Sequence, residues 1–193
     1  MERTGTQSAT RERILKTADA LFYREGTRAV GVDRIIAEAG VAKMSLYKHF
    51  PSKDELILAV LQYREKNFLA YFEDRMAQHR KKIKDPLKVF FAALRDWFET
   101  PSFRGCAFIN ASVELADANH PGFAFARGHK ERFGGFLKGL AEQAAGKAGA
   151  GIAPAIGLLV EGAIVTAVLQ GRADAADVAC NAAMKLRGGT RMA

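Results

Sequence analysis

The stretch Val32–Phe50 constrains the fold more than any other part of the chain. It predicts two short helices joined by a tight turn at Gly40. Apolar residues recur at helical spacing on both sides of the turn, namely Ile35, Ile36, Ala39, Leu46 and Phe50. Helices this short need a third helix to cover them, and Arg11–Glu25 supplies an amphipathic one. The pattern therefore predicts a helix-turn-helix.

The second of these helices has an outward face that suits a polyanion. When Leu46 and Phe50 turn inward, the remaining side chains are polar or basic, and no acidic residue occurs from Ala39 to Lys53. In a helix-turn-helix the second helix enters the DNA major groove. We expect base and groove contacts from Lys43, Met44, Ser45 and Tyr47. We expect phosphate contacts from Arg28, Lys48, His49 and Lys53.

The charge distribution agrees with this placement. The net charge is +8 over 193 residues, and residues 1–53 contain ten Lys+Arg against six Asp+Glu. The other 140 residues contain nineteen against fifteen, so positive charge is densest around the helix-turn-helix. An apolar fraction of 49% predicts a folded globular protein. The sequence has no signal-peptide pattern at its start, and Gly and polar residues interrupt the apolar stretch Ile156–Leu169, so we expect a cytoplasmic protein without a membrane partner.

Other chemistries find little support in the sequence. Cys106 and Cys180 are far apart and lack metal-ligand spacing, which argues against a disulfide framework or a zinc site. Glu114, Asp117 and His120 have three-residue spacing, but capping or solvation explains them better than a metal ion does. The sequence contains no Ser-His-Asp arrangement, phosphate loop or dinucleotide fingerprint. We therefore expect no enzyme activity, cofactor or metal.

A family resemblance rests on the helix-turn-helix residues. The segment GVAKMSLYKHFPSKDEL, preceded by EGTRAVGVDRIIAEAG, resembles the DNA-binding domain of the tetracycline-repressor (TetR) family of bacterial regulators. The resemblance covers Arg11–Leu56, and GCAFINASVELADANHPGF is similar to a segment of one branch of the family. It implies a homodimeric, all-helical regulator that releases DNA when a small molecule enters its C-terminal domain. Gly31 and Ala42 stand where the family often has a Ser or Thr helix cap.

The domain prediction is all-α throughout. Residues 1–10 are expected to be a flexible arm, residues 11–53 the helix-turn-helix domain, and residues 54–193 a helical ligand-binding and dimerisation domain. Ser52 and Glu55 form a capping-box pattern that begins a long helix from Lys53 to about His79. Further helices are expected over residues 86–98, 106–118, 123–145, 154–170 and 174–186, with a flexible connector over residues 146–153.

Aromatic residues after the helix-turn-helix predict a small-molecule site. The expected lining residues are Phe90, Phe91, Leu94, Trp97, Phe98 and Phe108, with Asn110, Glu114, His129 and Glu161 as orienting polar groups. Phe103, Ile109, Phe123 and Phe133 are further candidates. The alternative is that most of these side chains fill a core.

The last two helices are apolar around much of their circumference, which predicts a dimer interface. We expect it to be formed by Ile156, Val160, Ile164, Ala167, Val178 and Ala182 in a four-helix bundle. The alternative is a buried hairpin of a monomer. Our interpretation is a repressor that binds a pseudo-palindromic operator as a homodimer and is relieved by an apolar or aromatic ligand. A helical small-molecule or lipid-binding module without operator-specific DNA binding is the alternative function.

Overall fold

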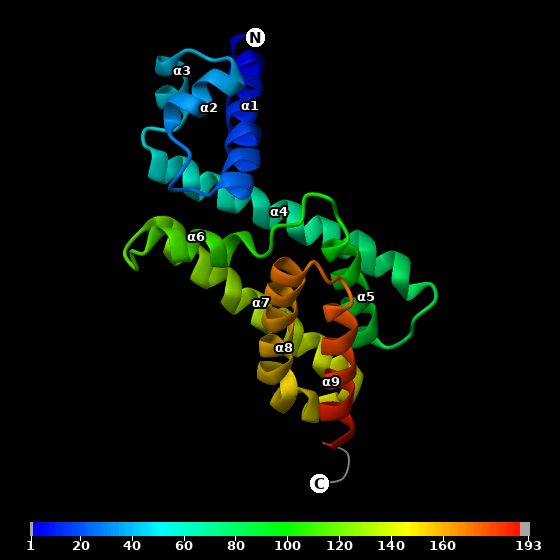
Figure 1. Ribbon diagram of the computed structural model, residues 1–193. Helices are drawn as coiled ribbons and strands as arrows, with labels where there is room; N and C mark the ends of the chain where they lie inside the picture. Colours follow the sequence, from blue (N-terminus) through cyan, green and yellow to red (C-terminus); the bar gives the residue numbers. More distant parts are fainter. Residues whose placement is uncertain (1, 190–193) are drawn as a thin grey trace. The chain divides into compact units, whose positions relative to one another are not determined.

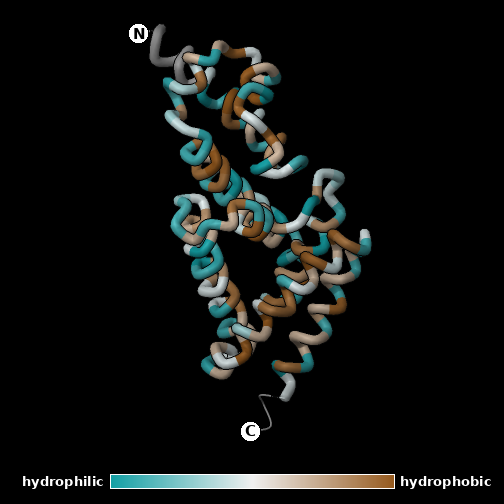
Figure 2. Tube along the Cα trace, turned by 60° about the vertical axis from the view of Figure 1, so that its left-hand side comes forward, coloured by the Kyte–Doolittle hydropathy of each residue, from teal (hydrophilic) through white to brown (hydrophobic). Residues whose placement is uncertain are grey.

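The computed structural model describes residues 2–189 and their side chains from residue 9 onward, and over these residues it is all-helical, as predicted (Figure 1). The first helices are α1 (Glu2–Glu25), α2 (Val32–Ala39), α3 (Lys43–His49), α4 (Lys53–Arg80) and α5 (Pro86–Phe98). They are followed by α6 (Ala107–Leu115), α7 (Pro121–Ala145), the short 3₁₀ helix η1 (Gly146–Ala148), α8 (Gly149–Gln170) and α9 (Ala175–Gly189). Polar and apolar segments alternate along the helices, as amphipathic helices require (Figure 2).

The chain forms two compact units that do not divide at residue 53. Unit 1 extends to Asn67 and also includes Cys106–His129. Unit 2 contains Phe68–Gly105 and the chain from Lys130 onward. Helices α4 and α7 each contribute one part to unit 1 and the other to unit 2. Helix α6 therefore belongs to the unit that contains the helix-turn-helix, although more than fifty residues separate the two in sequence.

The core of unit 1 is built on α1, which contacts both α2 and α3. The apolar positions chosen by periodicity are buried, among them Ile14, Leu21, Ile35, Leu46 and Leu56. The Ser52 hydroxyl accepts a hydrogen bond from the Glu55 N–H at 3.1 Å, which is the predicted cap of α4. Burying these side chains and capping α4 fix the positions of α2 and α3 within the unit.

Unit 2 packs α5 against α8 and α9, and α8 and α9 lie side by side (Figure 1). Asp85 caps α5 by accepting from the Leu87 and Lys88 N–H groups at 3.0 and 3.1 Å, and it also pairs with Arg187 of α9. Burial alone would raise the pKa of Asp85, but these hydrogen bonds hold that pKa below its ordinary value. A second ion pair joins Arg95 of α5 to Asp177 of α9.

Two helices begin earlier in the structure than expected. Helix α1 begins at Glu2 rather than at Arg11, and Met1 lies outside the described residues. Residues 146–153, expected to be a connector, form η1 and the first turn of α8. Helix α8 thus includes Pro154, which removes one backbone donor without ending the helix.

One part of the described chain is long and apolar enough to cross a membrane by length and composition alone. It lies within the helical stretch Pro121–Gln170, and 33% of the most apolar window is buried. The exposed remainder includes Leu158, Val165 and Leu169 of α8. The same test is passed by apolar helices of water-soluble proteins, so this is weak evidence for a membrane span.

Candidate DNA-binding site

The turn between α2 and α3 is fixed by backbone hydrogen bonds around a glycine. Gly40 has φ +60°, the left-handed conformation that glycine adopts without strain. Its N–H donates to the Ala37 carbonyl and the Val41 N–H donates to the Ile36 carbonyl, both at 3.2 Å. These two bonds form a Schellman motif, which ends α2 and sends the chain directly into α3.

Neither short helix has a side-chain cap. Gly31 precedes α2 and Ala42 precedes α3 in extended conformation, and neither makes a side-chain hydrogen bond. The expectation that Gly31 and Ala42 occupy helix N-cap positions is therefore confirmed. The Ala42 carbonyl still accepts from the Ser45 N–H at 2.9 Å, so α3 begins with backbone bonds only.

Helix α3 buries one face and exposes the other. Leu46 is fully buried and Phe50 nearly so, while Met44 is 80% exposed. A shallow open depression on the outer face is lined by Met44, Ser45, Tyr47 and Lys48. The structure thus brings four of the predicted DNA-contacting residues together on one surface.

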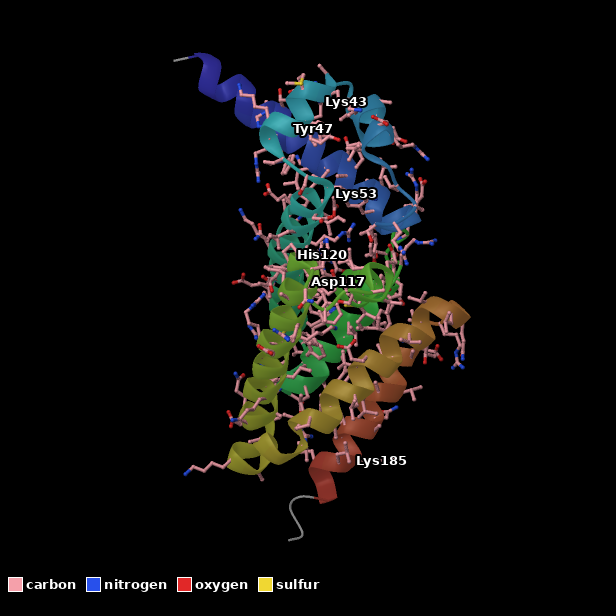
Figure 3. The ribbon with its side chains drawn as sticks, turned by 90° about the vertical axis from the view of Figure 1, so that its left-hand side faces the viewer. Lys43, Tyr47, Lys53, Asp117, His120 and Lys185 are labelled. Atoms are coloured by element: carbon pink, nitrogen blue, oxygen red, sulfur yellow. The ribbon has the colours of Figure 1, made fainter. Side chains whose placement is uncertain are left out.

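Cations border this outer face. Lys43 is exposed and its ammonium lies 3.3 Å from Asp33 of α2, a partner that the acid-free run in the sequence did not indicate. Figure 3 shows Lys43 and Tyr47 on α3 and Lys53 at the start of α4. The Lys53 ammonium is 5.9 Å from the Phe22 ring centroid, and burial lowers the pKa of Lys53.

Arg28 and His49 are two further predicted DNA contacts, and Arg11 is a cation that the sequence did not indicate. Arg28 is exposed in the loop before α2, and His49 is half-buried at the end of α3. The Arg11 guanidinium lies 4.9 Å from the Phe50 ring centroid, which brings another cation to the end of α3. Arg11 was not predicted as a DNA contact, because nothing in the sequence pairs α1 with Phe50 in space.

Helix α1 is braced against α4 by a partly buried ion pair. The Arg64 Nε lies 2.5 Å from Asp19 Oδ1, and the Arg64 guanidinium lies 3.6 Å from the Tyr23 ring centroid. Burial raises the pKa of Asp19, and the charge and hydrogen bond of Arg64 oppose that rise. This contact links the helix that supports α2 and α3 to the long helix that follows them.

The predicted ligand residues of unit 1 are engaged in contacts within that unit. Glu114 accepts hydrogen bonds from Thr27 and Arg28. His129 is 4% exposed, and its Nδ1 lies 2.9 Å from Glu65 Oε1. The His129 ring stacks on Phe108 at a centroid distance of 3.6 Å. Glu114 therefore joins α6 to the loop after α1, and His129 joins α7 to α4 and α6.

A small cavity lies between α1, α4 and α6 in unit 1. Its volume is about 40 Å³, and its lining includes Asn110 and Glu114 together with Thr27 and Arg64. Drug-sized ligands occupy cavities of about 300 to 1,000 Å³, whereas roughly 15 Å³ of such volume already holds a water molecule. The cavity suits water rather than an effector.

The predicted ligand residues of unit 2 divide into core and half-exposed groups. Phe90, Phe91, Leu94 and Phe98 are buried, so these four belong to the core, as the alternative interpretation of the sequence held. Trp97 is half-buried, and its indole lies 5.4 Å from the Phe68 ring and 4.9 Å from the Phe103 ring. Glu161 pairs with Lys130 at 2.5 Å, and the Lys130 ammonium lies 5.8 Å from the Phe133 centroid. Phe68 was not among the residues predicted from sequence.

The triplet Glu114, Asp117 and His120 does not converge on one point. Glu114 is held by the loop after α1, and Asp117 accepts from the Asn119 N–H at 2.9 Å. His120 accepts from the Gly122 N–H at 2.9 Å through Nδ1, and its Nε2 lies 3.2 Å from Asp54. Asp117 and His120 follow α6 in the loop that leads to α7 (Figure 3). Each of the three residues has its own separate partners.

The predicted interface residues of α8 lie on the inner face of that helix. Ile156, Val160, Ile164 and Ala167 are buried within a single chain, so their side chains offer no surface to a partner. This corrects the choice of face. Helix α8 is apolar all round, and the face that carries the predicted residues is the one that packs within the chain, where α8 contacts α5 and α9. Val178 is 61% exposed and Ala182 is half-buried, so these two residues of α9 remain available.

Comparisons with known sequences point to one family. Residues 14–60 match the family described as bacterial regulatory proteins, tetR family. The chain is 36% identical over 84 residues to the HTH-type transcriptional activator FasR of Mycolicibacterium smegmatis, which covers 42% of this chain and 38% of FasR. It is 29% identical over 109 residues to the HTH-type transcriptional repressor ComR of Escherichia coli, covering 55% of this chain and 51% of ComR. The chain thus spans about half, or less, of these curated relatives.

Solved structures extend the likeness beyond the helix-turn-helix. SCO4454, a TetR-family transcriptional regulator from Streptomyces coelicolor, superposes with a TM-score of 0.83 at 29% identity, covering 95% of this chain and 96% of that one. The reduced form of Escherichia coli NemR has a TM-score of 0.73 at 19% identity, covering 91% and 95%, and shares the fold. The named relatives are regulators rather than enzymes, as the lack of catalytic motifs predicted. Because the family match covers the residues that form the helix-turn-helix, and the likeness to SCO4454 continues through nearly all of the chain, the protein belongs to the TetR family of transcriptional regulators and its helix-turn-helix is a DNA-binding domain.

Proposed function

We propose that this regulator is a cytoplasmic repressor that binds a pseudo-palindromic operator as a homodimer and is released from it by an apolar or aromatic small molecule. The observation that carries the proposal is the outer face of α3, where Met44, Ser45, Tyr47 and Lys48 line one open surface. A lipid-binding module would have no need of a cationic surface of this kind. A reporter fused to the target promoter tests the direction of control, because loss of a repressor raises expression.

Replacing Lys48 with Ala is expected to weaken binding to all duplex sequences alike and to reduce the salt slope by about 0.9, the value for one phosphate contact. Lys48 is exposed at the edge of the α3 surface. Replacing Ser45 with Ala should instead alter sequence preference, because that side chain is proposed to contact the base edges. Gel-shift titrations over a range of salt concentrations measure both effects.

Lys185→Ala is the matched control for this experiment. Lys185 is exposed on α9 in unit 2, outside the helix-turn-helix (Figure 3). It removes one positive charge as Lys48→Ala does, so the two variants have the same net charge. Equal salt slopes in the two variants would contradict the assignment of Lys48 to a phosphate.

The dimer proposal rests on exposed apolar side chains. Leu158, Val165 and Leu169 recur at seven- and four-residue spacing and so share one face of α8, and Leu158 and Leu169 are 76% and 78% exposed. Val178 adds an exposed apolar side chain on α9. A second copy of the chain would cover this surface, and exposed apolar patches typically mark such interfaces.

Ligand release is proposed to begin at half-exposed aromatic rings in unit 2. The Phe68 ring lies edge-to-face against two others, with ring-centroid distances of 5.4 Å to Trp97 and 6.2 Å to Phe133. Phe68 belongs to α4, the helix that also continues into unit 1. A ligand shifts the DNA equilibrium only if it binds the released state more tightly, and a ring on α4 is a place where that difference can arise.

Replacing Phe133 with Ala is expected to lower effector affinity about tenfold without changing operator affinity in the absence of effector. Trp97 is the only tryptophan and lies within this cluster, so its fluorescence reports binding when small aromatic compounds are titrated. Leu69→Ala, an exposed apolar truncation on α4, is the control. A compound that saturates the Trp97 signal and leaves operator affinity unchanged would refute ligand release.

A further inference from the structure

The end of α6 is joined to the loop after α1 through one carboxylate oxygen. Glu114 Oε2 accepts hydrogen bonds from the Thr27 hydroxyl at 2.7 Å, from the Arg28 N–H at 3.3 Å and from the Thr27 N–H. Thr27 is 7% exposed, so these bonds form largely out of contact with water. Hydrogen bonds to a charged acceptor in such a setting are the strong ones.

The loop is shaped around this carboxylate. Gly26 has φ +95°, a conformation that other residues adopt only with strain. A Cβ atom at Gly26 would lie 2.9 Å from both carboxylate oxygens of Glu114, so the space is also closed to a side chain. Glycine at this position therefore lets the loop approach Glu114 closely enough for Thr27 and Arg28 to donate.

The loop before α2 buries Thr27 and Val30, and Glu114 accepts hydrogen bonds from its Thr27 and Arg28 groups. Gly31, the cap of α2, makes no side-chain hydrogen bond. The contact of α6 with α1 and α4 includes the small residues Ala107 and Ala111 beside the cavity of about 40 Å³. The apolar packing of α6 against α1 and α4 therefore leaves a small cavity on this side. The hydrogen bonds of Glu114 add to the contact between α6 and the loop.

The other end of α6 is anchored within the same unit. Phe108 stacks on His129 of α7, and His129 contacts Glu65 of α4. Helix α6 is thus held at one end against α4 and α7 and at the other against the loop. The position of α6 consequently sets the position of residues 26–28.

From this geometry we infer that Glu114 is a positioning residue for DNA binding. It holds the loop so that the Arg28 side chain reaches a phosphate and α2 begins at the correct angle. The inference goes beyond the proposed function and depends on it only for the phosphate contact of Arg28. It gives α6, far from α3 in sequence, an effect on DNA affinity through this loop.

The test compares Glu114→Ala and Glu114→Gln in the full chain by operator titration over a range of salt concentrations. Glu114→Ala is expected to weaken operator binding about tenfold and to reduce the salt slope by about 0.9, as loss of the Arg28 phosphate contact would. Glu114→Gln should retain most of the affinity, since an amide oxygen accepts the same bonds. Glu131→Gln, an exposed change on α7, is the control.

A double-mutant cycle with Arg28→Ala separates positioning from general stability. If Glu114 acts through Arg28, Arg28→Ala should weaken binding about tenfold in the parent and less than about threefold in Glu114→Ala. Additive losses would overturn the inference, as would Glu114→Ala with parental affinity. Failure of the parent chain to bind duplex DNA would instead refute the proposed function.

Hydrogen exchange gives a readout that needs no DNA. The Thr27 and Arg28 amides should exchange faster in Glu114→Ala than in the parent, and close to the parental rate in Glu114→Gln. Should Glu114→Ala fail to fold, Thr27→Val removes only the hydroxyl donor and is expected to weaken operator binding about threefold. Unchanged exchange in Glu114→Ala, or unchanged affinity in Thr27→Val when the alanine variant does not fold, would overturn the inference.

Discussion

Replacing Leu158 with Glu is expected to convert the protein to monomers and to lower operator affinity by about a hundredfold or more. Leu158 is 76% exposed on the outer face of α8, where the proposed partner copy would cover it. A buried carboxylate without a partner is strongly unfavourable, and two-fold symmetry would bring a carboxylate from each copy into the same interface. Each DNA-binding domain would then bind its half-site without the help of the other.

Light scattering coupled to gel filtration measures the oligomeric state, and gel shifts measure the affinity. Leu69→Glu is the matched control, since Leu69 is 57% exposed on α4 of the same unit and lies outside α8 and α9. The control should remain dimeric with parental operator affinity. A dimeric Leu158→Glu variant would show that this face of α8 is not the interface.

The helix-turn-helix was predictable because its signals are local. Gly40 marks the left-handed end of α2, and Ser52 caps α4, so both boundaries follow from residues within a few positions of them. The inward turn of Leu46 and Phe50 follows from helical spacing alone, and both are buried. The residues on the outer face of α3 therefore follow from the same spacing.

The face of α8 could not be predicted, because periodicity carries no information when a helix is apolar on every side. Ile156 and Leu158 are both large aliphatic residues, yet Ile156 is fully buried and Leu158 is 76% exposed. Which side packs against α5 and α9 depends on the positions of those helices. Sequence patterns can therefore predict that such a helix has apolar partners on two sides. They do not indicate which face packs within the chain and which face is exposed.

The contacts of Glu114 and His129 could not be predicted for a related reason. Their partners, Thr27 and Glu65, lie 87 and 64 residues away in sequence. A polar residue in an aromatic-rich segment matches the composition of a ligand site, and composition does not distinguish a ligand from a distant loop. Only the assembly of unit 1 brings the carboxylate of Glu114 to the Thr27 and Arg28 amides.

Replacing Gly149 with Ala is expected to destabilise the protein by about 3 kcal/mol, near the upper end for an overpacked site. A Cβ atom at Gly149 would lie 2.1 Å from the Ala141 carbonyl oxygen and 2.3 Å from its carbonyl carbon. Both atoms belong to the backbone of α7, so no side-chain rotation relieves the contact, and the start of α8 must move away from α7. That displacement also disturbs the helix that carries the proposed dimer face.

Gly151→Ala is the matched control and should have the opposite sign. Gly151 lies two residues further along α8, is exposed, and has no atom within 4 Å of the point that a Cβ atom would occupy. Alanine there removes conformational freedom from the unfolded chain and should stabilise by about 0.5 to 1 kcal/mol. Thermal unfolding at one protein concentration should thus place Gly149→Ala roughly 6 to 12 °C below the parent and Gly151→Ala slightly above it. If both variants shifted in the same direction, the close approach of α7 and α8 at Gly149 would be refuted, because helix propensity alone treats the two glycines alike.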